Sequence, residues 1–349
     1  MFDRTYILPL LHDTDKVMHL YVLPVSGGAY VSQLAILQHL CEARMIPELI
    51  FASSGGNVAA YIALAAQWKW AGIERIVEEL NCTLFAKPWH NIPPLAFLMG
   101  VMKGNIYSGG SGVGDFFHRH FDRDLVTSIE IWTGTNNVEE QRSTIFCNRG
   151  ETCLDVEGFD HDLYNSSPLQ YLDGEVTKIG KVSIASASIP SIVPPQEIDG
   201  YHYADGGISG ASPLTTMHEI IEKTVTDTLH IVYINSCNLM KCEKVVDGNV
   251  FHTWKQAMSD LVRSQTAIDR AAAHSLIRRK VGRNLHELFL PCNRETLHRV
   301  LEIRKRNQYT LLEIYAQKSY EVDITSFTGE EAVRTLRQAY RDCRMRLWY

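Results

Sequence analysis

Short apolar runs alternate with amphipathic segments in the first seventy residues of the chain. Residues 18–25 (MHLYVLPV) form a nearly continuous apolar run, and residues 48–52 (ELIFA) form a second one. Runs of this length and composition are typical of strands that are buried on both faces. Residues 32–44 and 57–68, which follow these runs, carry apolar residues at helical spacing. The order strand, helix, strand, helix predicts an α/β fold in which helices cover both faces of a mainly parallel sheet.

The later part of the chain continues with less regular elements. Further strands are predicted at residues 128–132, 143–147, 182–185 and 229–234. Residues 251–280 and 329–348 are predicted to be helices, and the second of these is clearly amphipathic. We therefore expect a core over residues 1–240 and a mostly helical extension over residues 241–349 that packs on the same domain.

The stretch from Phe85 to Phe121 differs from its surroundings because it mixes large apolar residues with prolines and many glycines. Two structures fit this composition. One is a mobile flap over a site, and the other is an irregular packed loop with a short helix.

Composition and charge narrow the class of protein. Of the 349 residues, 45% are apolar and 21% are charged, as in ordinary globular proteins. The net charge of −6 argues against nucleic acid as a partner. The longest apolar stretches, 58–66 and 92–102, fall well short of the ~20 residues that span a bilayer. The first residues lack the cleavage pattern of a signal peptide, so we expect a cytoplasmic protein that is soluble and contacts membrane surfaces only transiently.

The eight cysteines are spread along the chain. The nearest pairs are Cys237 with Cys242 and Cys147 with Cys153, and no second Cys/His pair at metal-ligand spacing completes either of them. The sequence therefore predicts no metal site, and it favours a reducing compartment with most thiols buried.

The strand-to-helix turn at residues 50–57 (IFASSGGN) carries the first candidate for chemistry. A sharp turn of this kind presents one side chain at its apex, and the residues two before and two after the apex must be small. With Ser54 at the apex these neighbours are Ala52 and Gly56, whereas with Ser53 one of them is the bulky Phe51. Sterics therefore select Ser54 as the nucleophile, unless the turn is simply a serine helix cap beside two glycines.

Two further loops carry glycines that suit catalysis. Gly27 and Gly28 follow the first strand, and consecutive glycines let backbone N–H groups approach an anion such as a tetrahedral oxyanion. Asp205 precedes Gly206 and Gly207, which is a common turn signal. The same loop also suits a carboxylate that accepts a serine proton, provided that the two side chains are in direct contact.

These three pieces, in this order, resemble the patatin-like phospholipase family. Its pattern is a glycine-rich oxyanion turn, a G-x-S-x-G elbow about 25 residues later and a D-G-G loop much further on. Residues 185–190 (ASASIP), 193–195 (VPP) and 205–213 also look like the family's run up to its D-G-G ending. The resemblance covers roughly residues 18–214. It implies a three-layer α/β/α fold, a Ser54–Asp205 dyad and an oxyanion hole made by Gly27 and Gly28, with Gly55 as a further donor.

The sequence departs from the family pattern in its first turn and in its elbow. Ser26, Tyr30 and Val31 stand where the family usually has a glycine, a basic residue and a glycine, and Ala52 replaces a glycine in the elbow. Loss of the basic residue is expected to weaken anchoring of the oxyanion loop or of an anionic head group.

The resemblance implies hydrolysis of acyl esters of lipids or phospholipids, with no cofactor. Transfer of the acyl group to an acceptor other than water remains an alternative. A second alternative is a Ser-His-Asp triad, for which His202 is the histidine nearest to Asp205 in sequence. A third is a catalytically impaired relative that binds lipid or protein, which the changes at Ser26 and Tyr30 favour.

Overall fold

A computed structural model describes most of the chain. The described residues are 18–79, 111–152, 169–190, 193–210, 212–218, 221–222, 228–236, 250–282, 285–318, 320–322 and 328–349.

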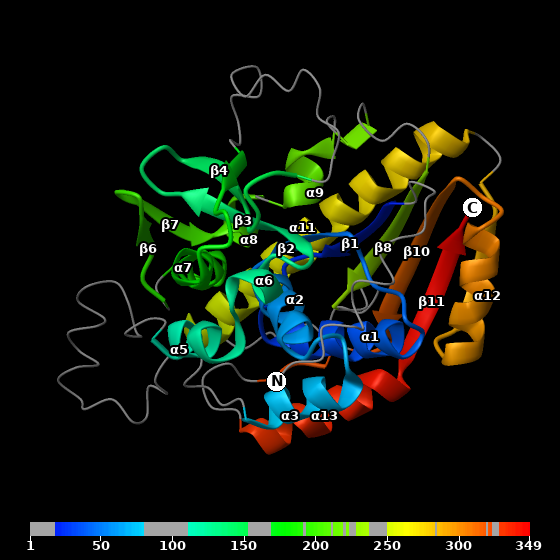
Figure 1. Ribbon diagram of the computed structural model, residues 1–349, viewed down its shortest axis with the longest axis horizontal. Helices are drawn as coiled ribbons and strands as arrows, with labels where there is room; N and C mark the ends of the chain where they lie inside the picture. Colours follow the sequence, from blue (N-terminus) through cyan, green and yellow to red (C-terminus); the bar gives the residue numbers. More distant parts are fainter. Residues whose placement is uncertain are drawn as a thin grey trace.

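One mixed sheet runs through the molecule (Figure 1). Its strands are β1 (Met18–Leu23), β2 (Leu49–Ser53), β3 (Glu130–Asn137), β4 (Arg142–Cys147), β5 (Leu169–Tyr171), β6 (Gln196–Ile198), β7 (Tyr201–Asp205), β8 (Leu229–Asn235), β9 (Glu287–Pro291), β10 (Tyr309–Ala316) and β11 (Cys343–Trp348). The order across the sheet is β5-β4-β3-β2-β1-β8-β10-β11-β9, and the β6–β7 hairpin joins at β3. The central strands from β3 to β10 are parallel, which confirms the mainly parallel sheet expected from the sequence.

Helices surround this sheet. They are η3 (Gly27–Ala29), α1 (Tyr30–Glu42), α2 (Gly55–Ala65), α3 (Trp70–Glu79), α5 (Ser111–His120), α6 (Arg123–Val126), α7 (Val176–Ser186), α8 (Gly206–Ser209), α9 (Pro213–Thr216), α11 (Val250–Val281), α12 (Arg294–Arg304) and α13 (Gly329–Arg341). Among the described helices, none is long and apolar enough to cross a bilayer.

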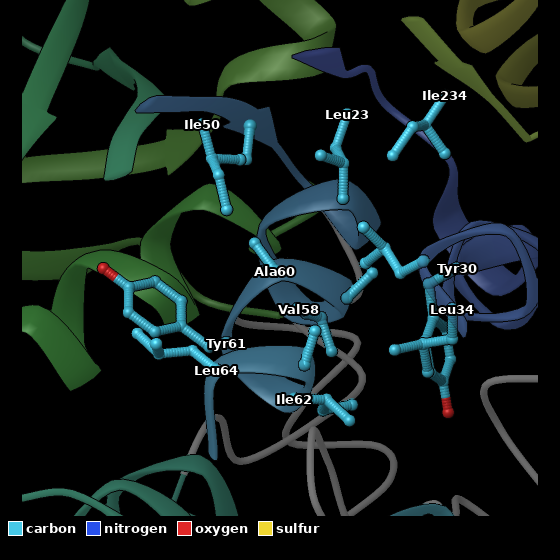
Figure 2. Close-up of a cluster of buried hydrophobic side chains, with 14 of the residues drawn as sticks. Leu23, Tyr30, Leu34, Ile50, Val58, Ala60, Tyr61, Ile62, Leu64 and Ile234 are labelled. Atoms are coloured by element: carbon cyan, nitrogen blue, oxygen red, sulfur yellow. The ribbon is translucent and has the colours of Figure 1, made fainter. Parts of the chain in front are cut away.

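The two faces of the sheet carry separate hydrophobic cores because successive strand residues point to opposite sides. In β1, Leu23 belongs to a core shared with α1 and α2, whereas Val22 belongs to a core shared with α9 and α11. Figure 2 shows the first core, in which Ile50 of β2 and Ile234 of β8 lie with residues of α2. The architecture is therefore three layers, α/β/α, as predicted.

The C-terminal part of the chain contributes strands as well as helices. β10 pairs with β8 in parallel, and β11 and β9 extend the sheet beyond it. The predicted helix at 329–348 is correct as far as Arg341 and wrong beyond it, because residues 343–348 form β11. The reason is visible in the burial of that segment. Cys343, Met345 and Leu347 are buried and alternate with half-exposed arginines, which is the two-residue period of a strand.

The predicted strand at 182–185 is also wrong, since these residues belong to α7. Their β-branched and small residues resemble a short strand when taken alone. Over the longer segment, Val176, Ile179 and Val182 recur every three residues, and Ile179 and Val182 are fully buried. That spacing puts them on one helix face, and packing of the face decides the structure over the local preference.

The glycine- and aromatic-rich stretch at 85–121 lies outside the described residues as far as residue 110. Residues 111–120 form α5, whose Phe116 and Phe117 are buried in the core beneath α2 and α7.

Candidate active site

Strand β3 aligns the two candidate catalytic loops. Its first half pairs with β2, so that Ser53 lies opposite Gly134. Its second half extends past the end of β2 and pairs with β7, so that Thr135 lies opposite Asp205. The ends of β2 and β7 thus pair with two consecutive residues of β3, Gly134 and Thr135. Ser54, which follows Ser53, is brought beside Asp205 although the two are 151 positions apart in sequence.

Ser54 stands at the apex of a strained turn between β2 and α2. Its backbone angles are φ 53° and ψ −128°, a region that residues with side chains rarely adopt. A conformation of this kind costs about 1–3 kcal/mol and persists only where the surroundings enforce it. Here the close approach of α2 to β1 enforces it. A Cβ added at Gly56 would overlap the carbonyl oxygen of Leu23 and lie 2.7 Å from that of Pro24.

The side chains of Ser54 and Asp205 are joined by a hydrogen bond. Ser54 Oγ donates to Asp205 Oδ2 at 2.8 Å, and the N–H of Gly207 donates to Asp205 Oδ1 at 2.7 Å. Both side chains are buried, with 2% exposure each. Burial raises the pKa of Asp205 from its usual 3.8 to about 7, against the opposing effect of its two hydrogen bonds. A carboxylate with this pKa is a far better proton acceptor near neutral pH than an ordinary aspartate.

The segment ASASIP holds both members of this pair from one side. Ser186 Oγ accepts a hydrogen bond from the N–H of Ser54 at 2.9 Å and donates to the carbonyl oxygen of Gly134 at 2.8 Å. Two residues later, the carbonyl oxygen of Ser188 accepts from the N–H of Asp205 at 3.1 Å. The sequence drew attention to this segment through the family resemblance alone and assigned it no contact with the dyad.

The glycine turn after β1 lies directly against the Ser54 turn. A Cβ on Gly55 would overlap Ser26 Oγ and lie 2.6 Å from the carbonyl oxygen of Gly27. Gly27 has φ +50°, a conformation that glycine adopts without strain. Among the described residues, the N–H groups of Gly27 and Gly28 have no acceptor, whereas that of Ala29 donates to Ser26. The first N–H groups of α2, including that of Gly55, have no partner inside the helix. The turn therefore supplies several unused donors near Ser54.

The departures from the family pattern have local structural explanations. Ser26 Oγ donates to Gln33 Oε1, and Gln33 Nε2 donates to the carbonyl oxygen of Pro24, each at 2.8 Å. These two hydrogen bonds connect the glycine turn to α1 through the side chain of Gln33. Tyr30 is buried in the core with 1% exposure, beside Leu34 and Val58 (Figure 2). A residue in that position cannot reach an anionic head group.

A C-terminal segment also holds the glycine turn. The N–H of Val322 donates to the carbonyl oxygen of Gly28 at 3.1 Å, and Ser32 Oγ donates to the carbonyl oxygen of Tyr320 at 2.9 Å. These contacts were not foreseen, because nothing in the local sequence links residues nearly 300 positions apart.

The loop after Asp205 is anchored to α11. Asp269 is fully buried and accepts a hydrogen bond from Thr215 Oγ1 at 2.5 Å. Burial raises the pKa of Asp269 to about 6, while hydrogen bonds from Thr215 and Ser212 oppose that rise. A cavity of about 550 Å³ elsewhere on α11 is lined by residues between 267 and 279 and includes neither Ser54 nor Asp205.

Within the described part of the chain, no histidine forms a hydrogen bond with the side chain of Ser54 or Asp205. His202, the nearest in sequence, is half-exposed, and its Nδ1 lies 2.6 Å from Glu139 Oε1. Its backbone N–H donates to the same carboxylate. His202 therefore belongs to a surface contact between the β6–β7 hairpin and the turn that joins β3 to β4.

Comparison with known proteins gives one family and a distant structural likeness. The model of the family "Patatin-like phospholipase" matches residues 26–218, which is more than half of the chain. The search of the curated proteins found no match. Among solved structures, VipD from Legionella pneumophila is similar, with 12% sequence identity and a TM-score of 0.34. The likeness covers 93% of this chain but 66% of VipD, slightly less than two thirds of that protein's length.

Proposed function

The chain belongs to the patatin-like phospholipase family, and from that premise we propose that it is a lipid acyl hydrolase with a Ser54–Asp205 dyad. The observation that carries the proposal is the 2.8 Å hydrogen bond from Ser54 Oγ to Asp205 Oδ2, made by a serine with positive φ at a strand-to-helix turn. The combination matters because a strained turn projects the hydroxyl and the carboxylate is in contact to take its proton.

The reaction begins with attack of Ser54 Oγ on the carbonyl carbon of an acyl ester. Asp205 takes the serine proton as the new C–O bond forms, and the carbonyl oxygen becomes an oxyanion. The N–H groups of Gly27, Gly28 and Gly55 are the donors for that oxyanion, aided by the positive end of the α2 dipole. Collapse breaks the ester C–O bond, and the leaving alkoxide receives the proton from Asp205.

The acyl-enzyme is then cleaved by water. Asp205 accepts a proton from the water as its oxygen attacks the acyl carbonyl, and the same proton returns to Ser54 Oγ when the acid leaves. One carboxylate serves both halves of the cycle, so the chemistry requires neither a histidine nor a cofactor. The raised pKa of Asp205, about 7, supports this dual role.

The family indicates (phospho)lipid esters as the substrate class. The surroundings of the dyad support an uncharged reacting portion, because Ser54 and Asp205 are buried among apolar elements and Tyr30 occupies the position of the family's basic residue. We infer that substrate is recognised at the dyad through its acyl group, with transient contact at a membrane surface. Product analysis distinguishes transfer of the acyl group to water from transfer to another acceptor.

The test is labelling by a fluorophosphonate probe, which reacts only with an activated serine. We expect the wild type to be labelled, Ser54→Ala to be unlabelled and Asp205→Asn to be labelled at least about 10²-fold more slowly, the lower range for loss of a positioned base. His202→Ala is the matched control and should be labelled as fast as the wild type. Release of fatty acid from phosphatidylcholine vesicles then tests the substrate class.

The alternative function is a catalytically impaired relative that binds lipid or protein. Ser26 is the observation that favours it, since its side chain lies against Gly55 at the oxyanion turn. A folded wild type that resists the probe would support this alternative, and Ser26→Gly would then be expected to restore labelling.

A further inference from the structure

A cluster of two thiols and an imidazole that includes neither Ser54 nor Asp205 lies where α1 meets the C-terminal strands. His39, Cys292 and Cys343 each offer one ligand atom, and these atoms all lie within 4.8 Å of one another. His39 and Cys343 are buried, with 3% and 1% exposure, while Cys292 is half-buried. Figure 1 shows the elements involved, with α1 lying near β11 and α13.

The fold brings the two cysteines together as a cross-strand pair. β9 and β11 are antiparallel, and Pro291 at the end of β9 pairs with Arg344. Cys292 follows Pro291, and Cys343 precedes Arg344 at the start of β11. The register therefore sets the two cysteines opposite each other, with their side chains on the same face of the sheet. His39 reaches the same face from α1.

His39 is held in the state and orientation that a metal ligand needs. Its Nε2 lies 2.9 Å from the carbonyl oxygen of Tyr340, which can only accept, so Nε2 carries the proton. The lone pair is therefore on Nδ1, which is buried, finds no nitrogen or oxygen partner among the described residues and lies within 4.8 Å of both sulfurs. The ring stacks on that of Tyr340, with centroids 3.7 Å apart and planes 8° apart. A backbone carbonyl bonded to the second ring nitrogen is the usual support of a metal-binding histidine.

We propose that His39 Nδ1 and the sulfurs of Cys292 and Cys343 bind one thiophilic divalent cation, with Zn²⁺ as the representative ion. Two thiolates and a neutral imidazole suit Zn²⁺, whereas Mg²⁺ and Ca²⁺ require oxygen ligands. The two thiols each release a proton to solvent on binding, so that two thiolates neutralise the double charge of the ion. A fourth ligand enters from solvent on the half-exposed side of Cys292.

The site joins the N-terminal and C-terminal parts of the fold. Its histidine is on α1, the helix that follows the glycine turn, whereas Cys292 directly follows β9 and Cys343 is the first residue of β11. His39 lies about 14 Å along α1 from Tyr30, at 1.5 Å per residue, so the ion cannot touch the oxyanion turn. The expected role is a clip that stabilises the C-terminal strands against α1. Because it is separate from the dyad, its loss and the loss of esterase activity are distinguishable.

The experiment is titration of the full-length, reduced and chelator-treated protein with Co²⁺ followed by Zn²⁺. Thiolate ligation of Co²⁺ gives a sulfur-to-metal charge-transfer band that displacement by Zn²⁺ removes. We expect one such ion per chain in the wild type. Cys292→Ser and Cys343→Ser each remove one thiolate, so each should weaken the band. Each should also lower the affinity for Zn²⁺ by more than about 10–100-fold, which is the loss that removal of an outer-shell partner causes.

Cys41→Ser is the matched control, because Cys41 is a half-buried free thiol on the same helix as His39 and is not part of the cluster. It should keep both the band and the Zn²⁺ affinity. Zn²⁺ should also raise the melting temperature of the wild type and of Cys41→Ser, and should leave that of Cys292→Ser unchanged. Fluorophosphonate labelling of Cys292→Ser should equal that of the wild type, which shows that this variant is folded.

Two results would overturn the proposal. One is a folded, reduced wild type that gives no charge-transfer band. The other is a band of undiminished intensity in both Cys292→Ser and Cys343→Ser, since the ion would then be bound by other cysteines.

Discussion

At the scale of single residues, Ser54 is held in its unfavourable conformation by groups on three sides. Ser186 binds its N–H, Asp205 binds its hydroxyl and the carbonyl groups of β1 press against Gly56 behind it. The strain in the turn, about 1–3 kcal/mol, is part of the cost of placing a reactive hydroxyl at its apex beside Asp205. Burial of Asp205 likewise costs stability when the carboxyl is ionised, and it raises the pKa that proton transfer requires.

The raised pKa of Asp205 predicts opposite pH effects on stability and on activity. The folded state favours the protonated carboxyl, with a pKa of about 7 against a usual 3.8. The contribution of Asp205 to the free energy of unfolding is therefore fully present below about pH 4. It declines as the pH rises and is lost above about pH 7. Activity requires the carboxylate, so the rate of labelling by a fluorophosphonate probe should rise with pH, reach half its maximum near pH 7 and level off about one pH unit higher.

The measurement is the melting temperature of the wild type and of Asp205→Asn from pH 4 to pH 8. Asparagine carries no charge at any pH, so the variant should gain stability over the wild type as the pH rises. The gain should reach at most about 4 kcal/mol, since three pKa units are worth 1.36 kcal/mol each. At pH 4 the carboxyl is protonated in the folded state and about half protonated in the unfolded state, so the difference there is close to its low-pH limit and serves as the internal control. A difference that does not change with pH would show that Asp205 titrates normally.

At the scale of elements, the end of α7 acts as a support for both catalytic loops. Ser186→Ala leaves the N–H of Ser54 unpaired in a buried site, which costs about 1–3 kcal/mol of stability. It also frees the Ser54 turn to move, and small misplacements of reacting groups can lower rates by about 10²-fold. We expect a drop in the rate of probe labelling by at least about tenfold.

Ser188→Ala is the matched control for this prediction. Ser188 is as buried as Ser186, and within the part of the chain that the structure describes its Oγ donates only to the carbonyl oxygen of Ile184, at 2.7 Å. Its backbone carbonyl, which binds the N–H of Asp205, is unaffected by the substitution. The control should lose about 0.5–1.5 kcal/mol of stability and keep its labelling rate. Equal loss of labelling in both variants would show that α7 supports the site only through general packing.

At the scale of the whole molecule, the sequence was informative where a pattern is local. The strands and helices of the first seventy residues and the strand at 229–234 follow from hydrophobic periodicity, because buried parallel strands and amphipathic helices leave a direct trace. The apex at Ser54 could be chosen over Ser53 by sterics alone. The contact of Ser54 with Asp205 was inferred only through the family resemblance, since spacing does not reveal which loops β3 aligns.

Other features depend on contacts between distant segments and leave no local trace. Residues 182–185 of α7 were mistaken for a strand because tertiary packing of the whole helix, not local residue preference, determines their conformation. The hydrogen bond between Ser54 and Ser186 joins residues 132 positions apart. The hydrogen bond between Val322 and Gly28 joins residues 294 positions apart. The cluster of His39, Cys292 and Cys343 was missed for the same reason, because metal-ligand spacing in sequence applies only when the ligands are on neighbouring segments.

The continuous sheet predicts that the chain unfolds as one unit and that residues 1–240 do not fold alone. β8 is central, with β1 on one side and β10 on the other, and every residue of β8 is buried. A chain that ends at residue 240 lacks β10, so β8 becomes an open edge with exposed apolar residues on both faces. We expect it to aggregate or to bind a hydrophobic dye, with no cooperative melting. The full chain should melt in one calorimetric transition with equal calorimetric and van't Hoff enthalpies. Cooperative melting of the shortened chain, together with probe labelling at Ser54, would instead establish residues 1–240 as an independent domain and the C-terminal strands as an addition to it.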